Sequence, residues 1–492
     1  MTRATRPAVA LWRVAFNLVA VTELRTSSGE PGHDTDAELL VDDDGEERLP
    51  LVLGTSLKGA LRSHLVDELG GYGLPEAALA PAVLARVEAL FGKGQANPND
   101  VGQGAIILPD ALGAPSARFV RHHNRIDPKT RRVAENQRGG PKFDAAVWAR
   151  GTTFNVELDL LIDSSDGEQQ LVDDLAFALN GFVTGHVRVG ARTNRGSGQC
   201  RVDDLAARRI DLTTADGWVE RALGWTRPHE EFDQWAQRLT RRTSAAKWLR
   251  ITAMVTFGDG ILVGEDNSAP DGPDRRNLTT TGVAADQGER LELPGTSLVG
   301  AGIAAAASLN ARAIAGDVNK DRGVRVTKLL SALFGHVDGP GAGSAVRADS
   351  VPLRDAVEID VIRIAIDAWS NAPITGAMLE ERVPFNGTAD LRVMVRCAPD
   401  DPADAMFGLT MLAVKDVVMG LRPLGATSSI GRGYVTGRQP LTIELHDNGI
   451  QQTFDVPLDG SVSGEVRAMV ERWVAAAHAF ISDETAAEGA AS

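Results

Sequence analysis

Four short motifs occur twice in this chain, and the two sets follow the same order. Gly54-Thr-Ser-Leu-Lys-Gly-Ala returns as Gly295-Thr-Ser-Leu-Val-Gly-Ala. The other pairs are Leu90-Phe91-Gly92 with Leu333-Phe334-Gly335, Gly151-Thr152 with Gly387-Thr388, and the Gly-rich runs Gly190 to Gly198 with Gly425 to Gly433. The offset between the copies stays between 235 and 243 residues. This near-constant offset predicts a tandem duplication of a module of roughly 240 residues.

The composition allows two folded cores and limits the partners. A chain of 492 residues with 43% hydrophobic residues can bury two cores. The net charge of -15 gives no overall attraction to nucleic acid or to an anionic membrane, so any nucleic-acid surface must be local. No apolar run approaches the about 18 residues of a membrane span. Cys200 and Cys397 lie far apart, and we expect reduced, buried thiols in a cytoplasmic protein without a membrane partner.

Each copy shows the same succession of expected elements. A strand-like segment opens it (Leu11 to Val21, Trp248 to Phe257), and a helix follows at the Gly-Thr-Ser motif, with the hydroxyls as expected N-caps. A strand (153–162, 389–397), a helix (170–182, 403–419), the Gly-rich loop and a last strand complete the copy. The order strand–helix–strand–strand–helix–strand predicts the α+β class, as two tandem ferredoxin-like (RRM-like) modules with long insertions.

The spacing of the copies predicts four segments. Residues 1–202 form the first module, 203–247 a helical connector, 248–482 the second module, and 483–492 a disordered tail. The connector carries Trp218, Trp225 and Trp235, which we expect to pack in the core rather than to bind a ligand. A comparable amphipathic helix is expected near Ser463 to Ile481, after the second copy.

The strongest local departure from the acidic mean lies between Arg118 and Arg150. This segment holds nine Lys or Arg against three acids, together with aromatic residues, and reads as a projecting hairpin or long loop. Basic side chains can neutralise phosphates and aromatic rings can stack on bases, so we expect an RNA-binding surface here, with a solvated loop as the alternative. The neighbouring His122 and His123 would face opposite ways on a strand, and no shared metal site is expected. The candidate RNA-binding cations of the segment are Arg121, Arg125, Lys129, Arg131 and Arg132.

The first helix start carries two further candidate cations. Lys58 and Arg62 lie four residues apart on one helix face, where free backbone N–H groups attract anions. This pattern is consistent with an RNA phosphate site or with an ordinary capped helix. The second copy has Val299 and Ile303 at these positions, so any phosphate site there must use other groups.

The two Gly-rich loops do not open a helix, as a dinucleotide-binding fingerprint requires. They precede strand-like segments instead. We favour close approach of the backbone to a polynucleotide, with a structural turn as the alternative. The candidate RNA-binding residues are Arg188, Arg192, Arg195, Gly196 and Gly198 in the first loop, and Gly431, Arg432 and Gly433 in the second.

One acidic stretch is a candidate for catalytic carboxylates. It runs from His33 to Glu38 and contains Asp34 and Asp36, with Asp42 after it. A solvated acidic loop is the alternative. No paired Cys ligands and no HExxH motif are present.

Together these motifs resemble the RAMP superfamily. The resemblance rests on the Gly-Thr-Ser-Leu-Lys-Gly-Ala-Leu-Arg helix start, Leu-Phe-Gly, the terminal Gly-rich loop, and a middle section with Asn124-Arg125-Ile126-Asp127 and Gly151-Thr152-x-Phe154. It implies a backbone subunit of a type III CRISPR effector complex, and the fusion is similar to the double-backbone subunits of subtype III-D. The implied partners are guide RNA, single-stranded target RNA and other subunits.

The resemblance also implies metal-dependent cleavage of target RNA at an Asp before the Gly-rich helix start. Asp36 stands 18 residues before Gly54 and six before Asp42, so it is the implied catalytic residue and Mg²⁺ ligand, with Asp34 as the competitor. The same count from Gly295 gives Asn277, so the second site is either amide-substituted and inactive, or uses Asp274 after a shift in loop length. A structural guide-binding subunit without nuclease activity and a guide-processing endoribonuclease stay open as alternatives.

Overall fold

The computed structural model describes residues 8–33, 35–43, 48–93, 102–124, 142–223, 244–266, 272–283, 288–316, 320–336 and 341–482. We call residues 8–223 the first half and residues 244–482 the second half. Several residues singled out in the sequence lie outside the described ranges: Asp34, Arg125, Lys129, Arg131, Arg132, Trp225, Trp235 and the tail 483–492.

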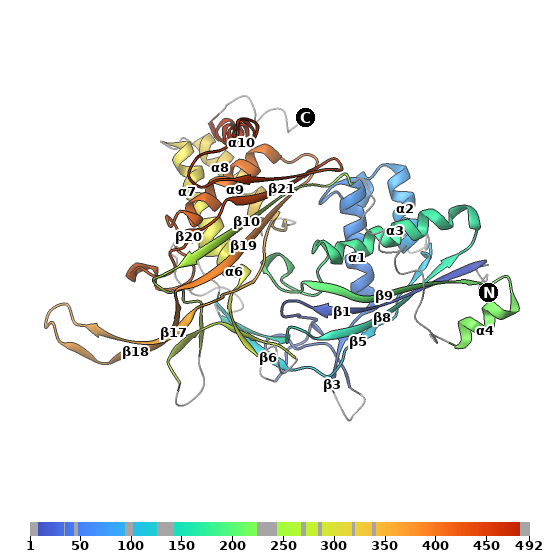
Figure 1. Ribbon diagram of the computed structural model, residues 1–492, viewed down its shortest axis with the longest axis horizontal. Coiled ribbons are helices and arrows are strands. Elements are labelled where there is room, and N and C mark those ends of the chain that lie inside the picture. Colours follow the sequence, from blue (N-terminus) through green and yellow to red (C-terminus); the bar gives the residue numbers. More distant parts are fainter. Residues whose placement is uncertain are drawn as a thin grey trace.

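The first half is built on an antiparallel sheet with β1 (Ala10–Ala20) at its centre. β1 pairs with β8 (Thr153–Ile162) on one side and β9 (Cys200–Asp211) on the other, and β4 (Ile106–Ile107) adds the edge beyond β8. Alternate side chains of β1 are buried, because Trp12, Val14, Phe16 and Leu18 face the helices. Those helices are α1 (Gly54–Gly70), α2 (Pro81–Phe91) and α3 (Ser165–Val183), which cover one face of the sheet (Figure 1).

The second half repeats this arrangement with one extra edge strand. β10 (Lys247–Phe257) lies between β19 (Gly387–Cys397) and β21 (Leu441–Asp447), with β15 (Val346–Ala348) beyond β19 and β22 (Ile450–Val456) beyond β21. The short β20 (Thr436–Gly437) also pairs with β10. Helices cover one face: α6 (Gly295–Ser297), the π-helical η4 (Leu298–Ala304), α7 (Ala305–Ala315), α8 (Lys320–Phe334), α9 (Ala403–Val418) and α10 (Gly464–Ser482).

These elements confirm the α+β class and most of the expected strands and helices. The helix expected near Ser463 is α10, and both cysteines are buried and free of disulfides. One helical stretch, Gly295–Ala315, is long and apolar enough to cross a membrane by composition alone, which the sequence reading had not anticipated. In the structure it packs within the second core, where Leu298, Ile303 and Ala307 are buried.

Three expectations are wrong in detail. Residues 203–211 belong to β9 rather than to a helical connector, because they pair with β1; only α4 (Ala215–Leu223) is helical in the described part of that segment. Trp218 on α4 is 53% exposed and is not core. The Thr and Ser hydroxyls do not cap the helix starts either. The amide N–H of Gly54 donates to Oδ1 of Asp110 (2.7 Å), and that of Gly295 to Oγ of Ser350 (3.1 Å).

Each half has a two-stranded hairpin, and that of the second half projects from the body (Figure 1). The first joins β6 (Arg118–Asn124) to β7 (Lys142–Trp148), and the second joins β17 (Val357–Ile366) to β18 (Pro373–Phe385), at the lower left of Figure 1. Short strands surround their bases: β2 (Val41–Asp43), β3 (Arg48–Val52), β5 (Ala111–Leu112), β11 (Gly264–Asp266), β12 (Arg275–Asn277), β13 (Thr279–Thr281), β14 (Glu289–Leu293) and β16 (Val351–Pro352).

Candidate nucleic-acid interface

The carboxylate of Asp36 is fixed against the second strand of the first hairpin. The amide N–H of Asp144 donates to Oδ2 of Asp36 (2.8 Å), and the amide N–H of Asp36 donates to the carbonyl of Asp144 (3.0 Å). The next residue, Ala37, forms a parallel bridge with Ala145. Asp36 is nevertheless exposed, because it lies on the loop and not under the sheet. An accessible carboxylate thus lies on a loop that is hydrogen-bonded to β7.

Asp274 occupies the same position in the second half. Its Oδ2 accepts a hydrogen bond from the amide N–H of Glu380 (2.8 Å), and the following residue, Arg275, pairs in parallel with Glu381. Asp274 is exposed as well. Asn277, which the residue count had offered as the alternative, is fully buried, and its amide bonds the backbone of Val263, Leu278 and Glu292. Asp274 is therefore the geometric counterpart of Asp36.

The two positions differ in the side chains beside them. In the first hairpin, Nδ1 of His122 lies 2.7 Å from Oδ1 of Asp144, and both side chains are partly exposed. In the second hairpin the residue paired with Glu380 is Ile362. His123, the neighbour of His122, is half-buried, and burial followed by the charges of Arg192, Arg25 and Arg121 lowers its pKa to about 3. The two histidines thus have different environments, as their places on a strand predicted.

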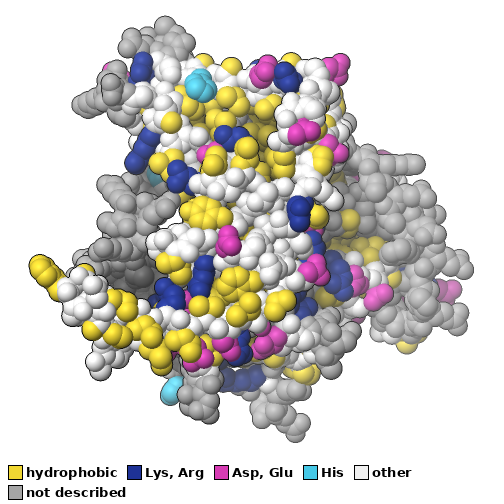
Figure 2. All heavy atoms as spheres, turned by 60° about the vertical axis from the view of Figure 1, so that its left-hand side comes forward, with side chains coloured by type: hydrophobic (Ala, Val, Ile, Leu, Met, Phe, Trp, Pro, Cys, Tyr) yellow, Lys and Arg dark blue, Asp and Glu magenta, His cyan; other side chains and the backbone are white. Residues whose placement is uncertain are grey.

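The second hairpin carries an exposed apolar stripe. Figure 2 shows hydrophobic side chains along this projection as far as its tip, where Trp369 is 97% exposed. The sequence had marked this hairpin only as less basic than the first. The exposed apolar residues are Val357, Ile359, Ile362, Ile364, Ile366, Ile374 and Met378. An alternation of Ile with polar residues from Val357 to Ile366 is the signal that could have identified the stripe.

The candidate cations that the structure describes on α1 and on the first hairpin, Lys58, Arg62 and Arg121, are bonded within the protein. Arg62 forms an ion pair with Glu76 (2.6 Å) and donates to the carbonyl of Gly92. Lys58 donates to the carbonyl of Ile106 (3.3 Å), and burial, followed by the charge of Arg62, lowers its pKa. Arg121 is buried and pairs with Glu23. The helix start of α1 also faces the carboxylate of Asp110, so the expected phosphate site has no free cation of this set.

The first Gly-rich loop is one of the contacts between the halves. Arg188 is buried and pairs with Asp349, and the guanidinium of Arg192 lies 4.6 Å from the ring of Phe143. Burial, then the charges of Arg25 and Arg195, lowers the pKa of Arg192 to about 10. Gly196 (φ +98°) packs on Ser350 of the second half, while Gly198 (φ +74°) packs on the carbonyl of Val189. Arg195 is exposed and stays a candidate for RNA.

The second Gly-rich loop is open on its outer side. Gly433 (φ +83°) packs on the carbonyl of Leu424, but no atom of the described chain lies within 4 Å of a side chain placed at Gly431. Arg432 is buried and pairs with Glu381 (2.6 Å). Burial raises the pKa of Glu381, yet Arg363 and Arg432 together lower it below its usual value. The charge of Arg432 is thus neutralised by Glu381 on β18 of the second hairpin.

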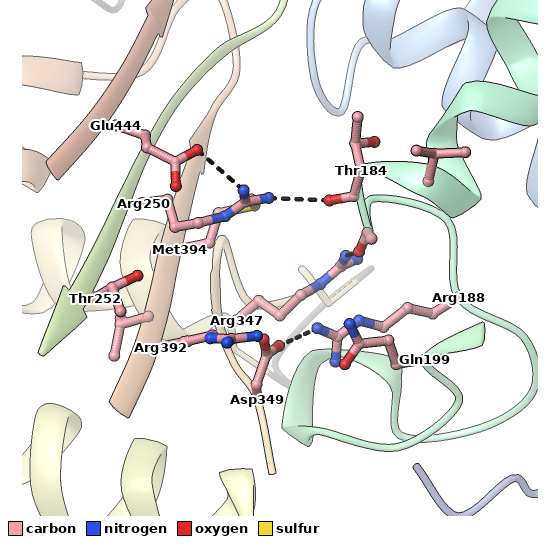
Figure 3. Close-up of a pocket in the computed structure, with 13 residues that line it drawn as sticks. Thr184, Arg188, Gln199, Arg250, Thr252, Arg347, Asp349, Arg392, Met394 and Glu444 are labelled. Atoms are coloured by element: carbon pink, nitrogen blue, oxygen red, sulfur yellow. Dashed lines mark hydrogen bonds and ion pairs between the residues drawn. The ribbon is translucent and has the colours of Figure 1, made fainter. Parts of the chain in front are cut away.

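A cavity of about 350 Å³ lies where the halves meet (Figure 3). The sequence reading pointed to only one of its cations, Arg188. The others are Arg250 on β10, Arg347 on β15 and Arg392 on β19. They were missed because they lie on three separate strands, each on the sheet face away from the helices, and only the fold brings them together.

One cluster among the described residues could hold a metal ion. His64, Glu68 and His186 offer ligand atoms within 4.8 Å of one another, at the junction and not at Asp36. Around Asp36, by contrast, the described side chains that could bind a metal ion are two carboxylates, those of Asp36 and Asp144. Such a hard oxygen donor fits a Mg²⁺ ion that takes its other ligands from phosphate and water.

The comparison with known protein families bears on the first half. Residues 17–201 match the family model described as the RAMP superfamily. The match covers less than half of the chain, so it shows a likeness of that segment to the RAMP superfamily. The RAMP superfamily suggests a CRISPR-associated RNA-binding subunit, working in a multi-subunit complex with RNA. No curated protein matches the chain.

Proposed function

We propose that the chain is a backbone subunit of a type III CRISPR ribonucleoprotein that holds guide RNA and cleaves complementary target RNA. In this proposal both halves are ferredoxin-like RAMP modules in tandem, and each contributes one cleavage position. The observation that carries it is the pair of exposed carboxylates, Asp36 and Asp274, each held at 2.8 Å by an amide N–H of a two-stranded hairpin.

The hairpins support a role in opening the RNA helix. Trp369 is 97% exposed at the tip of a stiff two-stranded arm, and isoleucines line the strand behind it. An apolar side chain of this kind can enter between bases or stack on one, because every base has an apolar face. A base displaced by the apolar side chains near Ile362 would move the flanking phosphodiester out of helical geometry close to Asp274, because Ile362 pairs with Glu380, whose amide holds Asp274.

Cleavage then follows from the target's own 2′-hydroxyl. Its oxygen attacks the adjacent phosphorus, the bond to the 5′-oxygen breaks, and the products are a 2′,3′-cyclic phosphate and a 5′-hydroxyl. Mg²⁺ held by Asp36 or Asp274 would supply positive charge for the phosphate oxygens. The amide N–H of Asp144 fixes Oδ2 of Asp36, which leaves Oδ1 for a ligand. Each position has a second carboxylate beside the first, Asp144 beside Asp36 and Glu380 beside Asp274, but only the first position has an imidazole, that of His122, where the second has Ile362.

The test is to map the cleavage of an end-labelled target RNA by the assembled complex. We expect Asp36→Asn to remove one cut and Asp274→Asn to remove another, each by about 100-fold or more, since such a loss is typical when one group that stabilises transition-state charge is removed. Glu30→Gln changes another exposed acid in the Asp36 loop and should leave both cuts.

Two results would contradict the proposal. Unchanged fragments from the Asp36→Asn, Asp274→Asn double variant would mean a structural guide-binding subunit. Cleavage of precursor guide RNA by the isolated chain without divalent metal would mean a guide-processing endoribonuclease.

A further inference from the structure

The cavity between the halves is built from residues of both. The first half contributes the end of α3 and the segment after it, with Thr184, Gly185 and Arg188. The second half contributes the outer face of its sheet, through β10, β15, β19 and β21. Figure 3 shows Arg188 and Arg392 directed toward Asp349 from opposite sides, with Arg347 between them directed toward the segment after α3. The cavity therefore exists only when the two halves are together.

Its lining has more positive than negative charge. Four arginines (Arg188, Arg250, Arg347 and Arg392) face two carboxylates, Asp349 and Glu444. Arg250 donates to the carboxylate of Glu444 (3.1 Å) and to the carbonyl of Thr184 (3.1 Å), and Arg188 forms an ion pair with Asp349. Both acids thus have a partner already. The positive charges of Arg347 and Arg392 have no carboxylate of their own in the described lining.

Arg347 shows that this excess charge is buried. Its side chain is 6% exposed, and its guanidinium donates only to the carbonyls of His186 (2.9 Å) and Gly185 (3.3 Å). Burial, followed by the charges of Arg396 and Arg188, lowers the pKa of Arg347 far below its usual value. Among the described residues, no acceptor bonds Nε of Arg347 or Nε of Arg188. Buried cations with unbonded donors are costly, and an anion would remove that cost.

Arg392 is the cavity arginine that solvent and a ligand can reach from outside. It lies at the mouth of the cavity, is exposed, and within the described chain its side chain makes no hydrogen bond or ion pair. Gln199, Thr252 and the backbone at Gly185 add neutral polar groups around it. The guanidinium groups can bind phosphate oxygens in pairs, which an ammonium group cannot do.

We propose that the cavity is a binding site for a phosphate group, held by Arg347 and Arg392 with Arg188 at its side, which fastens the two halves. The group is either a free phosphate or the phosphate of an RNA strand, since both present the same oxygens. This site is separate from the Asp36 and Asp274 positions and does not require cleavage of RNA.

The experiment uses the full chain, freed of RNA and kept in a chloride buffer. Inorganic phosphate is titrated at constant ionic strength, and thermal melting and calorimetry follow binding. We expect a saturable rise in melting temperature. Arg392→Gln should weaken phosphate binding about tenfold or more, because it removes a charged donor that has no internal partner to disturb. Arg392→Lys should restore part of the loss. Arg438→Gln, an exposed arginine elsewhere, should bind phosphate as the unaltered chain does.

The source of the phosphate is resolved by competition. If an unphosphorylated oligoribonucleotide displaces inorganic phosphate from the unaltered chain, the site takes an RNA phosphodiester; if it does not, the site takes free phosphate. Both results support the proposal. A phosphate response no greater than that of added chloride, or one that Arg392→Gln leaves unchanged, would overturn it, whatever the cleavage assay of the complex shows.

Discussion

The two Gly-rich loops share one backbone design and have opposite surroundings. A side chain at Gly198 would lie 2.0 Å from the carbonyl oxygen of Val189, and one at Gly433 would lie 2.0 Å from that of Leu424. Both glycines have positive φ. In each half, the last glycine of the loop thus packs against the residue that immediately precedes the loop. The halves differ at the preceding glycine. A side chain at Gly196 would lie 2.3 Å from Oγ of Ser350, whereas one at Gly431 would meet no atom of the described chain within 4 Å.

The residues around the loops explain this difference. Beside the first loop, Arg188 pairs with Asp349, Nδ2 of Asn194 donates to the carbonyl of Ser344 (3.1 Å), and Arg396 donates to Asn194 (3.1 Å). Beside the second loop, exposed apolar side chains stand instead, with Met419, Leu421 and Ile430 each at least half exposed. The glycine spacing therefore specifies the turn, and the polar side chains specify the contact between the halves.

The largest expected effect comes from adding one methyl group to each loop. Gly196→Ala should destabilise the protein by about 4 kcal/mol, since it combines about 1–2 kcal/mol for a left-handed backbone with about 1–3 kcal/mol for overpacking. Gly431→Ala has a similar φ (+91° against +98°) and no such clash, so only about 1–2 kcal/mol is expected. Urea unfolding followed by fluorescence measures both losses.

Equal losses in the two alanine variants would contradict the comparison. They would mean that the contact of Gly196 with Ser350 does not constrain the loop. If the clash is the cause, Ser350→Gly should cost less stability in the Gly196→Ala background than in the unaltered chain, because it removes the hydroxyl that the methyl group meets as well as the acceptor of the Gly295 amide N–H.

Acid should weaken the first half at the same junction. His64 on α1 is fully buried beside Glu68 and His186, and burial is the main cause that lowers its pKa to about 4, partly opposed by Glu68. Below the ordinary value near 6.5, the unfolded chain takes up a proton that the folded chain does not. Stability should therefore fall as the pH decreases from about 6.5 to about 4, by about 3 kcal/mol from His64 alone, and this contribution should stay level below that.

The pH effect is measured by urea unfolding at several pH values between 7 and 4. His64→Gln removes one titrating group and should give a shallower decrease than the unaltered chain. His478→Gln changes a histidine on α10 of the second half and serves as the matched control. An unchanged slope in His64→Gln would show that other groups set the acid sensitivity of the junction.

The sequence predicted what depends on local pattern and missed what depends on distant partners. Strands such as β10 and β19 follow from Val, Ile and Thr content, and the helix α10 follows from its periodicity. The role of Arg62 did not follow, because Glu76 comes from a different helical segment. Counting residues favoured Asn277 over Asp274 as the counterpart of Asp36, since a count cannot register the different loop lengths before the two helix starts. Only the pairing of β12 with β18 shows which residue faces the hairpin.

The smallest effect on stability is expected at the tip of the second hairpin. A substitution there should weaken RNA binding without weakening the fold. The first hairpin has His122 and Asp144 where the second has Ile362 and Glu380, so in the described parts of the two hairpins the apolar arm belongs to the second. Trp369→Ala should change stability by less than about 0.5 kcal/mol, because the side chain is 97% exposed. It should still weaken the binding of single-stranded RNA by about 1–2 kcal/mol, the usual contribution of one ring stacked on a base.

Filter binding at fixed salt measures this loss, with Trp218→Ala on α4 as the matched tryptophan. If both variants bind RNA equally well, the arm does not stack on bases, and the apolar stripe behind Trp369 has to be explained by contact with another protein.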